Sequence, residues 1–360
     1  KSIKFAYLTI SIVHLMDFTS IASPFLFLLF AAATAAIWVA GIRLTKAIDV
    51  ITIHFDLGEA FGGMVFLAIV TNLPEIAITF MAAKHHAYDL AVSNLLGGVA
   101  IQTVVLVLID VFGVGRSAPL THKGHSSILV LEGVALILIL TLVLMAKEFP
   151  SSFIFFRTTP FEWLILLIWL GSIFVVAKRS RSASDEKKQA QKLEEMRHPK
   201  APLQGGLSLA VWTLIIGAVV TLFAGYVLEV AGETMISRFD MSGALFGGTL
   251  LALCTALPEI STGIASAKLR NYNMAVSDIF GGNAFLPVLF LFASLIGGDA
   301  IIPNLNPTDT YLTSLGIFLT GIYIIGMVLH SKRQILRMGI DSFIVLIVYL
   351  LGLLGLTFIS

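Results

Sequence analysis

Long apolar stretches alternate with short polar segments along almost the whole chain. A helix needs about 20 apolar residues to cross a bilayer, and ten stretches approach or exceed that length. They lie near 25–43, 60–83, 89–112, 127–147, 158–177, 206–228, 243–267, 273–297, 311–330 and 338–358. The pattern therefore predicts an all-α polytopic membrane protein with ten transmembrane helices.

Composition supports this fold class and excludes several others. Hydrophobic residues make up 57% of the 360 residues and charged residues only 12%, whereas soluble domains carry about twice that share of charge. A water-soluble enzyme, a disordered chain and a nucleic-acid-binding protein are excluded, and the net charge of +1 indicates no polyanionic partner. One cysteine, Cys254, rules out a disulfide framework.

Two polar or ambiguous segments divide the chain. Residues 1–24 are set apart, because Phe5 to Ala22 has nearly the length of a crossing but contains His14 and Asp17. We interpret them as a possible extra transmembrane helix, in preference to a signal-like segment. Residues 178–205 form a polar linker or short amphipathic helix between a first half, 25–177, and a second half, 206–360.

Lysine and arginine predict the orientation, since positively charged loops stay in the cytoplasm. With the 178–205 linker on the cytoplasmic side, 17 of the 23 basic residues lie on that side. We therefore expect a multi-pass protein of the inner (plasma) membrane with a cytoplasmic linker.

The two halves contain a repeated sequence. Residues 55–100 align without gaps on residues 239–284, and 20 of these 46 positions are identical. Because each half has five crossings, an odd number, the second half enters the membrane from the opposite side. The sequence thus predicts two inverted five-helix repeats, an arrangement found in many secondary transporters.

Each repeat carries Thr-x-Leu-Pro-Glu at membrane depth. Proline removes a backbone donor and disrupts the helix, as we expect at Pro74 and Pro258. Unpaired carbonyls inside a membrane need a cavity or a cation. Carboxylate, hydroxyl and carbonyl oxygens together suit a hard cation. The candidate ligands are the acids Glu75 and Glu259, proposed as the metal ligands, with Thr71, Thr255 and Asn72 beside them.

A second polar motif follows each glutamate by eighteen residues, on the next crossing. Its glycine pairs permit close helix packing, and its polar side chains are candidate ligands or supporting residues. These are Ser93, Asn94 and Gln102 in the first half, and Ser277, Asp278 and Asn283 in the second. Glu132 and Glu162 lie near the ends of crossings, where we expect them to reach towards the membrane surface.

At these residues the chain resembles the cation/calcium antiporter superfamily, particularly its prokaryotic sodium/calcium exchanger-type members. The Pro-Glu motifs are similar to the family's Gly-Thr-Ser-Leu-Pro-Glu, and the second motifs to its Gly-Asn-x-x-Gly-Ser-Asn. The resemblance implies that Glu75 and Glu259 are the central ligands of calcium and of the counter-ion. Several family oxygen ligands are replaced by other residues, namely Asn72, Ala256, Gly98, Gly282 and Leu286.

The expected function is secondary-active antiport, with Ca2+ exchanged for Na+ or H+ by alternating access. The partners are then small inorganic cations and the lipid bilayer, without a cofactor, a nucleic acid or an evident obligate protein partner. Two alternatives remain: a sodium/proton or potassium/proton exchanger on the same fold, and a non-transporting membrane sensor or scaffold. Enzymatic motifs such as Gly-x-Ser-x-Gly and His-Glu-x-x-His are missing from the sequence.

Overall fold

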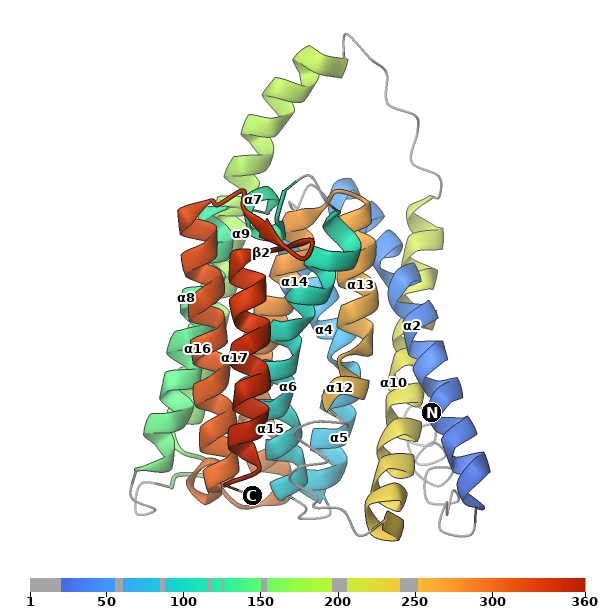
Figure 1. Ribbon diagram of the computed structural model, residues 1–360, viewed down its shortest axis with the longest axis vertical. Helices are drawn as coiled ribbons and strands as arrows, with labels where there is room; N and C mark the ends of the chain where they lie inside the picture. The colour runs from blue at the N-terminus through green and yellow to red at the C-terminus, as the bar shows by residue number, and fades with distance from the viewer. Residues whose placement is uncertain are drawn as a thin grey trace.

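The protein is a bundle of long, nearly parallel and antiparallel helices (Figure 1). The computed structural model describes residues 21–55, 61–84, 88–115, 118–124, 126–149, 154–195, 206–239 and 252–359. Within these ranges the only strands are β1 and β2, a two-stranded antiparallel hairpin near the C-terminal helix. The prediction of an all-α fold is confirmed.

The elements follow the order expected from two similar halves. The first half contains α2 (Ser23–His54), the π-helix η2 (Gly62–Leu67), α4 (Ala68–Thr71), α5 (Leu73–Lys84), α6 (Tyr88–Ile109), the π-helix η3 (Asp110–Val114), α7 (Leu120–Lys123), α8 (Ser127–Lys147) and α9 (Pro160–Glu195). The second half contains α10 (Leu207–Phe239), α12 (Ala252–Thr255), α13 (Leu257–Lys268), α14 (Tyr272–Phe285), η6 (Leu286–Val288), α15 (Leu289–Gly297), η7 (Ile302–Asn304), α16 (Pro307–Leu329), β1 (Gln334–Ile335), β2 (Met338–Gly339) and α17 (Ile340–Leu356).

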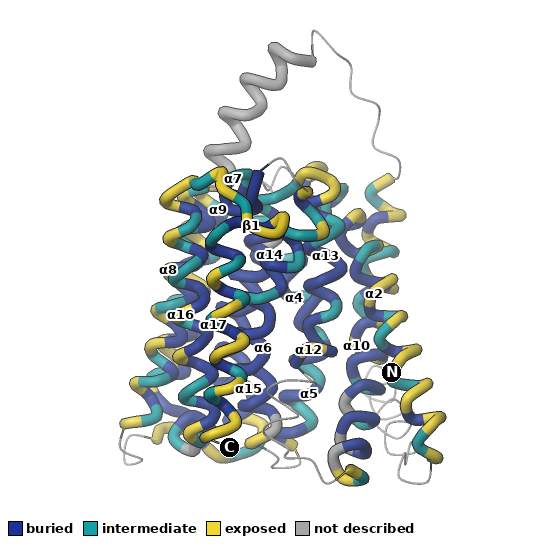
Figure 2. Tube along the Cα trace, in the orientation of Figure 1, coloured by how far each residue is buried: buried dark blue, intermediate teal, exposed yellow. Residues whose placement is uncertain are grey.

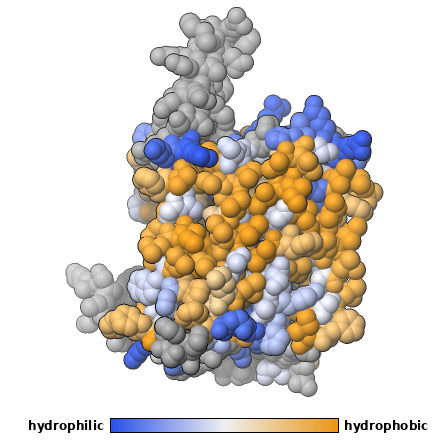
Figure 3. Space-filling view, turned by 90° about the vertical axis from the view of Figure 1, so that its left-hand side faces the viewer, coloured by the Kyte–Doolittle hydropathy of each residue, from blue (hydrophilic) through white to orange (hydrophobic). Residues whose placement is uncertain are grey.

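The outside of the bundle is apolar across its middle. Figure 3 shows a broad hydrophobic zone with hydrophilic residues gathered towards its two ends. In the described ranges seven helices are long and apolar enough to cross a membrane, and the bent pair Met64–Thr71 and Leu73–Lys84 forms an eighth crossing if it is one span. α17 is apolar but shorter. The total of ten crossings therefore remains a prediction.

The first helix of each half is longer than predicted. The sequence predicts crossings over 25–43 and 206–228, whereas α2 has 32 residues and α10 has 33. Polar residues near the ends, such as Arg43 and Asp49 in α2, end the apolar pattern but do not end the helix. At 1.5 Å per residue each helix is about 50 Å long, so it extends beyond the hydrocarbon core.

The segments between and before the halves are described in part. α9 continues to Glu195, so the first part of the predicted 178–205 linker is helical, and residues 196–205 lie outside the described residues. The predicted extra N-terminal helix also lies outside them, because the description begins at residue 21.

α2 and α10 form a separate layer of two helices. They pack along each other and contact the rest of the bundle chiefly through α13 and α5, respectively. The colours in Figure 1 show that they run in opposite directions, as an inverted repeat requires. Figure 2 shows the most completely buried segments in the centre of the bundle, among α6, α12 and α14.

Two repeat-related glycines allow this layer to approach the centre. A side chain at Gly41 of α2 would collide with Ser261 of α13. A Cβ atom at Gly225 of α10 would lie 2.6 Å from the Cβ of Pro74. The two glycines are 184 residues apart and are therefore equivalent in the repeat. Through them, each long helix contacts the proline-containing segment of the opposite half.

We predict that Gly41→Val and Gly225→Val each lower the melting temperature of the purified protein by several degrees. Overpacking of a close contact costs about 1–3 kcal/mol. Gly171→Val is the matched control, because a Cβ atom at Gly171 in α9 would meet nothing within 4 Å. Melting temperatures that fall equally in all three variants would contradict the close-contact assignment.

Candidate functional site

Both helices that carry Pro-Glu are interrupted at the predicted places. The first half breaks at Asn72, where α4 and α5 meet at 54°, and the second breaks at Ala256, between α12 and α13. Pro74 and Pro258 stand one turn or less beyond the breaks and lack the backbone N–H that would continue the helical pattern. Both interruptions thus lie within the Thr-x-Leu-Pro-Glu motifs.

Glu75 and Glu259 follow the two breaks and meet inside the bundle. Both side chains are 0% exposed, and Glu259 lies within electrostatic range of Glu75 and of Asp278. None of the four glutamate oxygens accepts a hydrogen bond from the described residues. Because an isolated buried carboxylate costs several kcal/mol to ionise, these oxygens require protons or cations.

Each glutamate lies beside the motif threonine of the other half. Thr255 is next to Glu75 and Thr71 is next to Glu259. The Thr255 hydroxyl nevertheless donates to the backbone carbonyl of Ala252, and the single hydrogen of the Thr71 hydroxyl is shared between the Ala68 carbonyl and Asp278. The hydroxyl oxygens thus remain close to the carboxylates with lone pairs available for a cation.

Asp278 is the third acid of the site and joins the two halves. It accepts hydrogen bonds from Thr262 at 2.7 Å and from Thr71 at 3.3 Å. Thr262 comes from its own half and Thr71 from the other. The structure therefore brings Asp278 into contact with the Pro-Glu segments.

Amides form a second polar group next to the acids. Gln102 donates to the side-chain oxygen of Asn72 at 3.2 Å, and a Cβ atom at Gly282 would lie 2.7 Å from the Asn72 nitrogen. Asn283 donates to Thr103 and to the backbone of Val99. The side-chain oxygens of Gln102 and Asn283 are buried and accept nothing from the described residues, so they are further acceptor oxygens for a cation.

Asn94, the counterpart of Asp278, is fully buried, and both its polar side-chain atoms lack a partner in the described part of the chain. A buried amide without partners is rare in folded proteins and calls for a bound water or ion. Asn94 therefore stays a candidate ligand.

The motif serines contact acids on other helices. Ser93 donates to Asp309 of α16 at 2.8 Å, and Ser277 donates to Glu132 of α8 at 2.8 Å. Each serine thus links its own half to the fourth crossing of the opposite half. Their predicted role as ion ligands is not tested by these contacts.

The expectation for Glu132 and Glu162 is wrong. Both are buried, with exposures of 1% and 0%, and neither reaches the surface. Glu162 caps the start of α9 through Thr159 N–H and also accepts from Ser294. Internal hydroxyl and N–H donors hold these carboxyl groups in the interior, which position along the chain alone could not reveal.

Sequence reasoning also missed Thr262. Its repeat counterpart is Ile78, just as Asp278 corresponds to Asn94. The second half therefore has an acid together with a hydroxyl donor, while the first half has an amide together with an apolar residue. The paired asymmetry is visible in the alignment, but the contact between the two positions requires the tertiary structure.

The arrangement suits a small cation bound mainly by oxygen atoms. Among the described residues no group of three or more His, Cys, Asp or Glu side chains is arranged to hold a metal ion by itself. A cation at Glu75 and Glu259 would take its remaining ligands from hydroxyl, amide and backbone oxygens, which Ca2+ and other hard cations prefer.

Comparison with known proteins agrees with this arrangement. The family model described as "Sodium/calcium exchanger protein" matches residues 25–178 and 209–358, most of both halves. The chain belongs to the sodium/calcium exchanger family. It is accordingly a multi-pass membrane transporter of the cation antiporter type and not an enzyme.

Two curated relatives of this exchanger are similar over part of its length. It is 26% identical over 254 residues to the inner membrane protein YrbG of Escherichia coli, covering 69% of this chain and 73% of that protein. It is 29% identical over 126 residues to sodium/potassium/calcium exchanger 1 of Homo sapiens, covering 33% of this chain and 11% of that protein.

A solved structure has the same fold. The sodium-calcium exchanger NCX_Mj, soaked with Na+ and Ca2+, superposes with a TM-score of 0.66 at 15% identity, covering 92% of this exchanger and 98% of that chain. The prediction of two repeats agrees with this match, and five crossings in each repeat stay a prediction.

We predict that Thr262→Val weakens cation binding by this exchanger about tenfold or more. The substitution removes a 2.7 Å hydrogen bond to a carboxylate, and bonds to charged groups contribute about 1.5–3 kcal/mol. The measurement is the rise in melting temperature on titration with Ca2+ and, separately, with Na+.

Thr213→Val is the control, since the partly exposed Thr213 of α10 donates to the Leu209 carbonyl of its own helix. Thr262→Ser should restore most of the binding because it keeps the hydroxyl. Unchanged cation binding by the Thr262→Val variant would show that Thr262 and its hydrogen bond to Asp278 do not contribute to the cation site.

Proposed function

We propose that this exchanger is a secondary-active antiporter that moves Ca2+ in exchange for Na+ or H+ by alternating access. Glu75 and Glu259 are its central ligands, and Thr71, Thr255, Asp278, Asn72, Asn94, Gln102 and Asn283 supply or position further oxygens. The proposal rests chiefly on one observation: two fully buried glutamates from the two repeats lie within electrostatic range of each other, and their carboxylate oxygens find no hydrogen-bond partner among the described residues.

Electrostatics gives a reason for exchange rather than one-way transport. Two ionised carboxylates in a dry interior repel each other, and each has a large desolvation cost. A doubly ionised empty site is therefore unfavourable, and the site should change access only when Ca2+, sodium ions or protons occupy it. This condition couples the two ion flows.

The α2–α10 layer is the proposed moving element. It rests on the Pro-Glu segments through Gly41 and Gly225, and the described parts of these helices contact few other elements. Displacement of this layer relative to α5 and α13 would open the site first to one side and then to the other.

The loss of several oxygen ligands that the family motifs contain favours a second candidate pair of transported ions. Ala256, Gly98, Gly282 and Leu286 supply no side-chain oxygen at positions where the family pattern has one. With fewer oxygens and an added acid at Asp278, the same site also suits Na+ or K+ exchanged for H+. A non-transporting sensor is the remaining alternative.

The proposed location is the inner membrane, with the 178–205 segment in the cytoplasm. The excess of basic residues on that side supports the orientation, and the similar Escherichia coli protein is named an inner membrane protein.

We predict that purified wild-type protein in proteoliposomes takes up 45Ca2+ when a sodium gradient or a pH gradient is imposed. Glu75→Gln and Glu259→Gln should each lower the initial rate about 100-fold or more, because breaking a buried charge arrangement costs about 3–5 kcal/mol. Glu148→Gln is the control, since Glu148 is exposed at the end of α8.

The outcomes separate the candidate functions. Sodium or potassium flux driven by a pH gradient, without calcium flux, would identify the protein as an exchanger of Na+ or K+ for H+. Cation-dependent thermal stabilisation without any flux would indicate a sensor. Wild-type calcium flux in both glutamine variants would refute the assigned site.

We further predict that Asp278→Asn changes the driving ion. The substitution gives both halves an amide at this position and removes one acid from the site. Calcium flux driven by a pH gradient should therefore fall by a larger factor than calcium flux driven by a sodium gradient. Both rates are measured in the same vesicles, and Asp299→Asn, remote from the Pro-Glu segments in the turn after α15, is the control. Equal losses under both gradients would contradict a specific role in proton coupling.

A further inference from the structure

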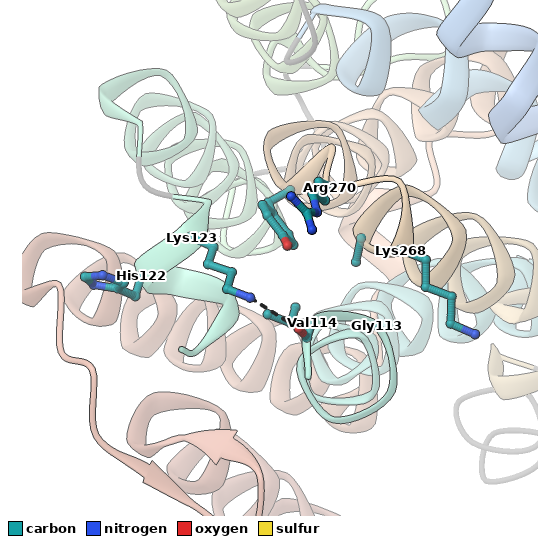
Figure 4. A pocket seen from close by; sticks show the side chains of 8 residues that line it. Gly113, Val114, His122, Lys123, Lys268 and Arg270 are labelled. Atoms are coloured by element: carbon teal, nitrogen blue, oxygen red, sulfur yellow. Dashed lines mark hydrogen bonds between the residues drawn. The ribbon is translucent and has the colours of Figure 1, made fainter. Parts of the chain in front are cut away.

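A basic hollow lies at the predicted cytoplasmic end of the bundle. Its volume is about 810 Å3, and its lining residues come from η3 and α7 of the first half and from α13 and the start of α14 of the second. Four of the eight are His122, Lys123, Lys268 and Arg270, and none of the eight is acidic. Figure 4 shows His122 and Lys123 on one side, Lys268 on the other and Arg270 between them.

Contacts within the hollow hold the Lys123 side chain in place. Lys123 donates to the carbonyl oxygen of Val114 at 3.3 Å and lies 5.3 Å from the centre of the Tyr272 ring. Lys268, the last residue of α13, and Arg270, on the turn after it, have exposed side chains. Several cations gathered around one hollow repel one another, so an anion bound among them is favoured.

The start of α14 adds to the positive potential. Tyr272 is the first residue of this 14-residue helix and lines the hollow. The preceding residue, Asn271, donates its side-chain amide to Asp49 of α2 and does not cap the helix. The N-terminal end of a helix carries partial positive charge, and this effect adds to the charges of Lys123, Lys268 and Arg270.

An apolar groove adjoins the basic hollow and shares Lys268 with it. The groove has a volume of about 360 Å3 and lies between α2 and α13. Trp38, Ile42, Ile264 and Leu269 line it, with Lys46 as a second basic residue. Trp38 and Leu269 are partly exposed on the outside of the bundle, and tryptophan is common at the membrane interface.

We propose that the hollow and the groove together bind one anionic phospholipid. The phosphate-bearing headgroup occupies the basic hollow, and an acyl chain lies in the groove along α2. A charged hollow alone would also accept a free phosphate, but an apolar groove that shares the lining residue Lys268 with it complements a lipid. Basic pockets between transmembrane helices on the cytoplasmic side are a known mode of headgroup binding.

The test measures lipid binding directly and does not depend on transport. Full-length protein in detergent is titrated with phosphatidylglycerol, with phosphatidylcholine and with inorganic phosphate, while melting temperature and lipid retained after washing are recorded. Phosphatidylglycerol should raise the melting temperature by several degrees, and phosphatidylcholine and inorganic phosphate should have little effect. Lys268→Gln should weaken phosphatidylglycerol retention about fivefold, and Lys268→Gln with Arg270→Gln by more than tenfold.

Two further variants distinguish the parts of the site. Lys332→Gln with Arg333→Gln removes two exposed basic residues beyond α16 at the same end of the bundle, and should retain lipid as the wild type does. Ala265→Trp fills the groove without changing any charge and should also lower phosphatidylglycerol retention.

Some results would overturn the proposal. Equal stabilisation by inorganic phosphate, with Ala265→Trp unaffected, would identify a soluble anion as the ligand. Equal retention in the Lys268 and Lys332 variants would show that lipid binding depends only on the overall charge of this face.

Discussion

The structure depends on two buried glutamates whose carboxylate oxygens accept no hydrogen bond within standard geometry from the residues that the structure describes. Glu75 and Glu259 enter the centre of the bundle from opposite sides, each just beyond a proline that interrupts its helix. Ordinary packing would not place two such groups together, because their desolvation and mutual repulsion oppose folding. The surrounding helices therefore hold an arrangement that becomes favourable only when protons or cations are bound.

The rest of the fold supplies that support from both halves. Ser93 and Ser277 anchor their helices to Asp309 and Glu132 of the opposite half. Asp278 receives one hydroxyl from each half. Because these contacts cross between the repeats, neither half could build the site alone. In contrast, α2 and α10 contact the site segments at narrow glycine positions, which leaves the supporting helices intact if the outer pair moves.

The two repeats are alike in backbone but differ in chemistry. Asp278 and Thr262 stand where the first half has Asn94 and Ile78, and the basic hollow is completed by residues of both halves. An inverted repeat makes the two access pathways similar in shape. Differences in side chains then determine which ion binds and which face of the protein interacts with other molecules.

The sequence by itself determined the all-α membrane fold with its repeated halves, and it predicted the paired helix breaks and the two central glutamates. These depend on local features: apolar length, proline chemistry and a 184-residue periodicity. Only the tertiary structure decided the partners of Asp278 and the burial of Glu132 and Glu162. It also decided the length of α2 and α10 and the joining of Lys123 to Arg270 in one hollow. Such contacts link residues that are distant in the sequence. The hydropathy of a residue also does not reveal whether its side chain will find a hydrogen-bond partner in the interior.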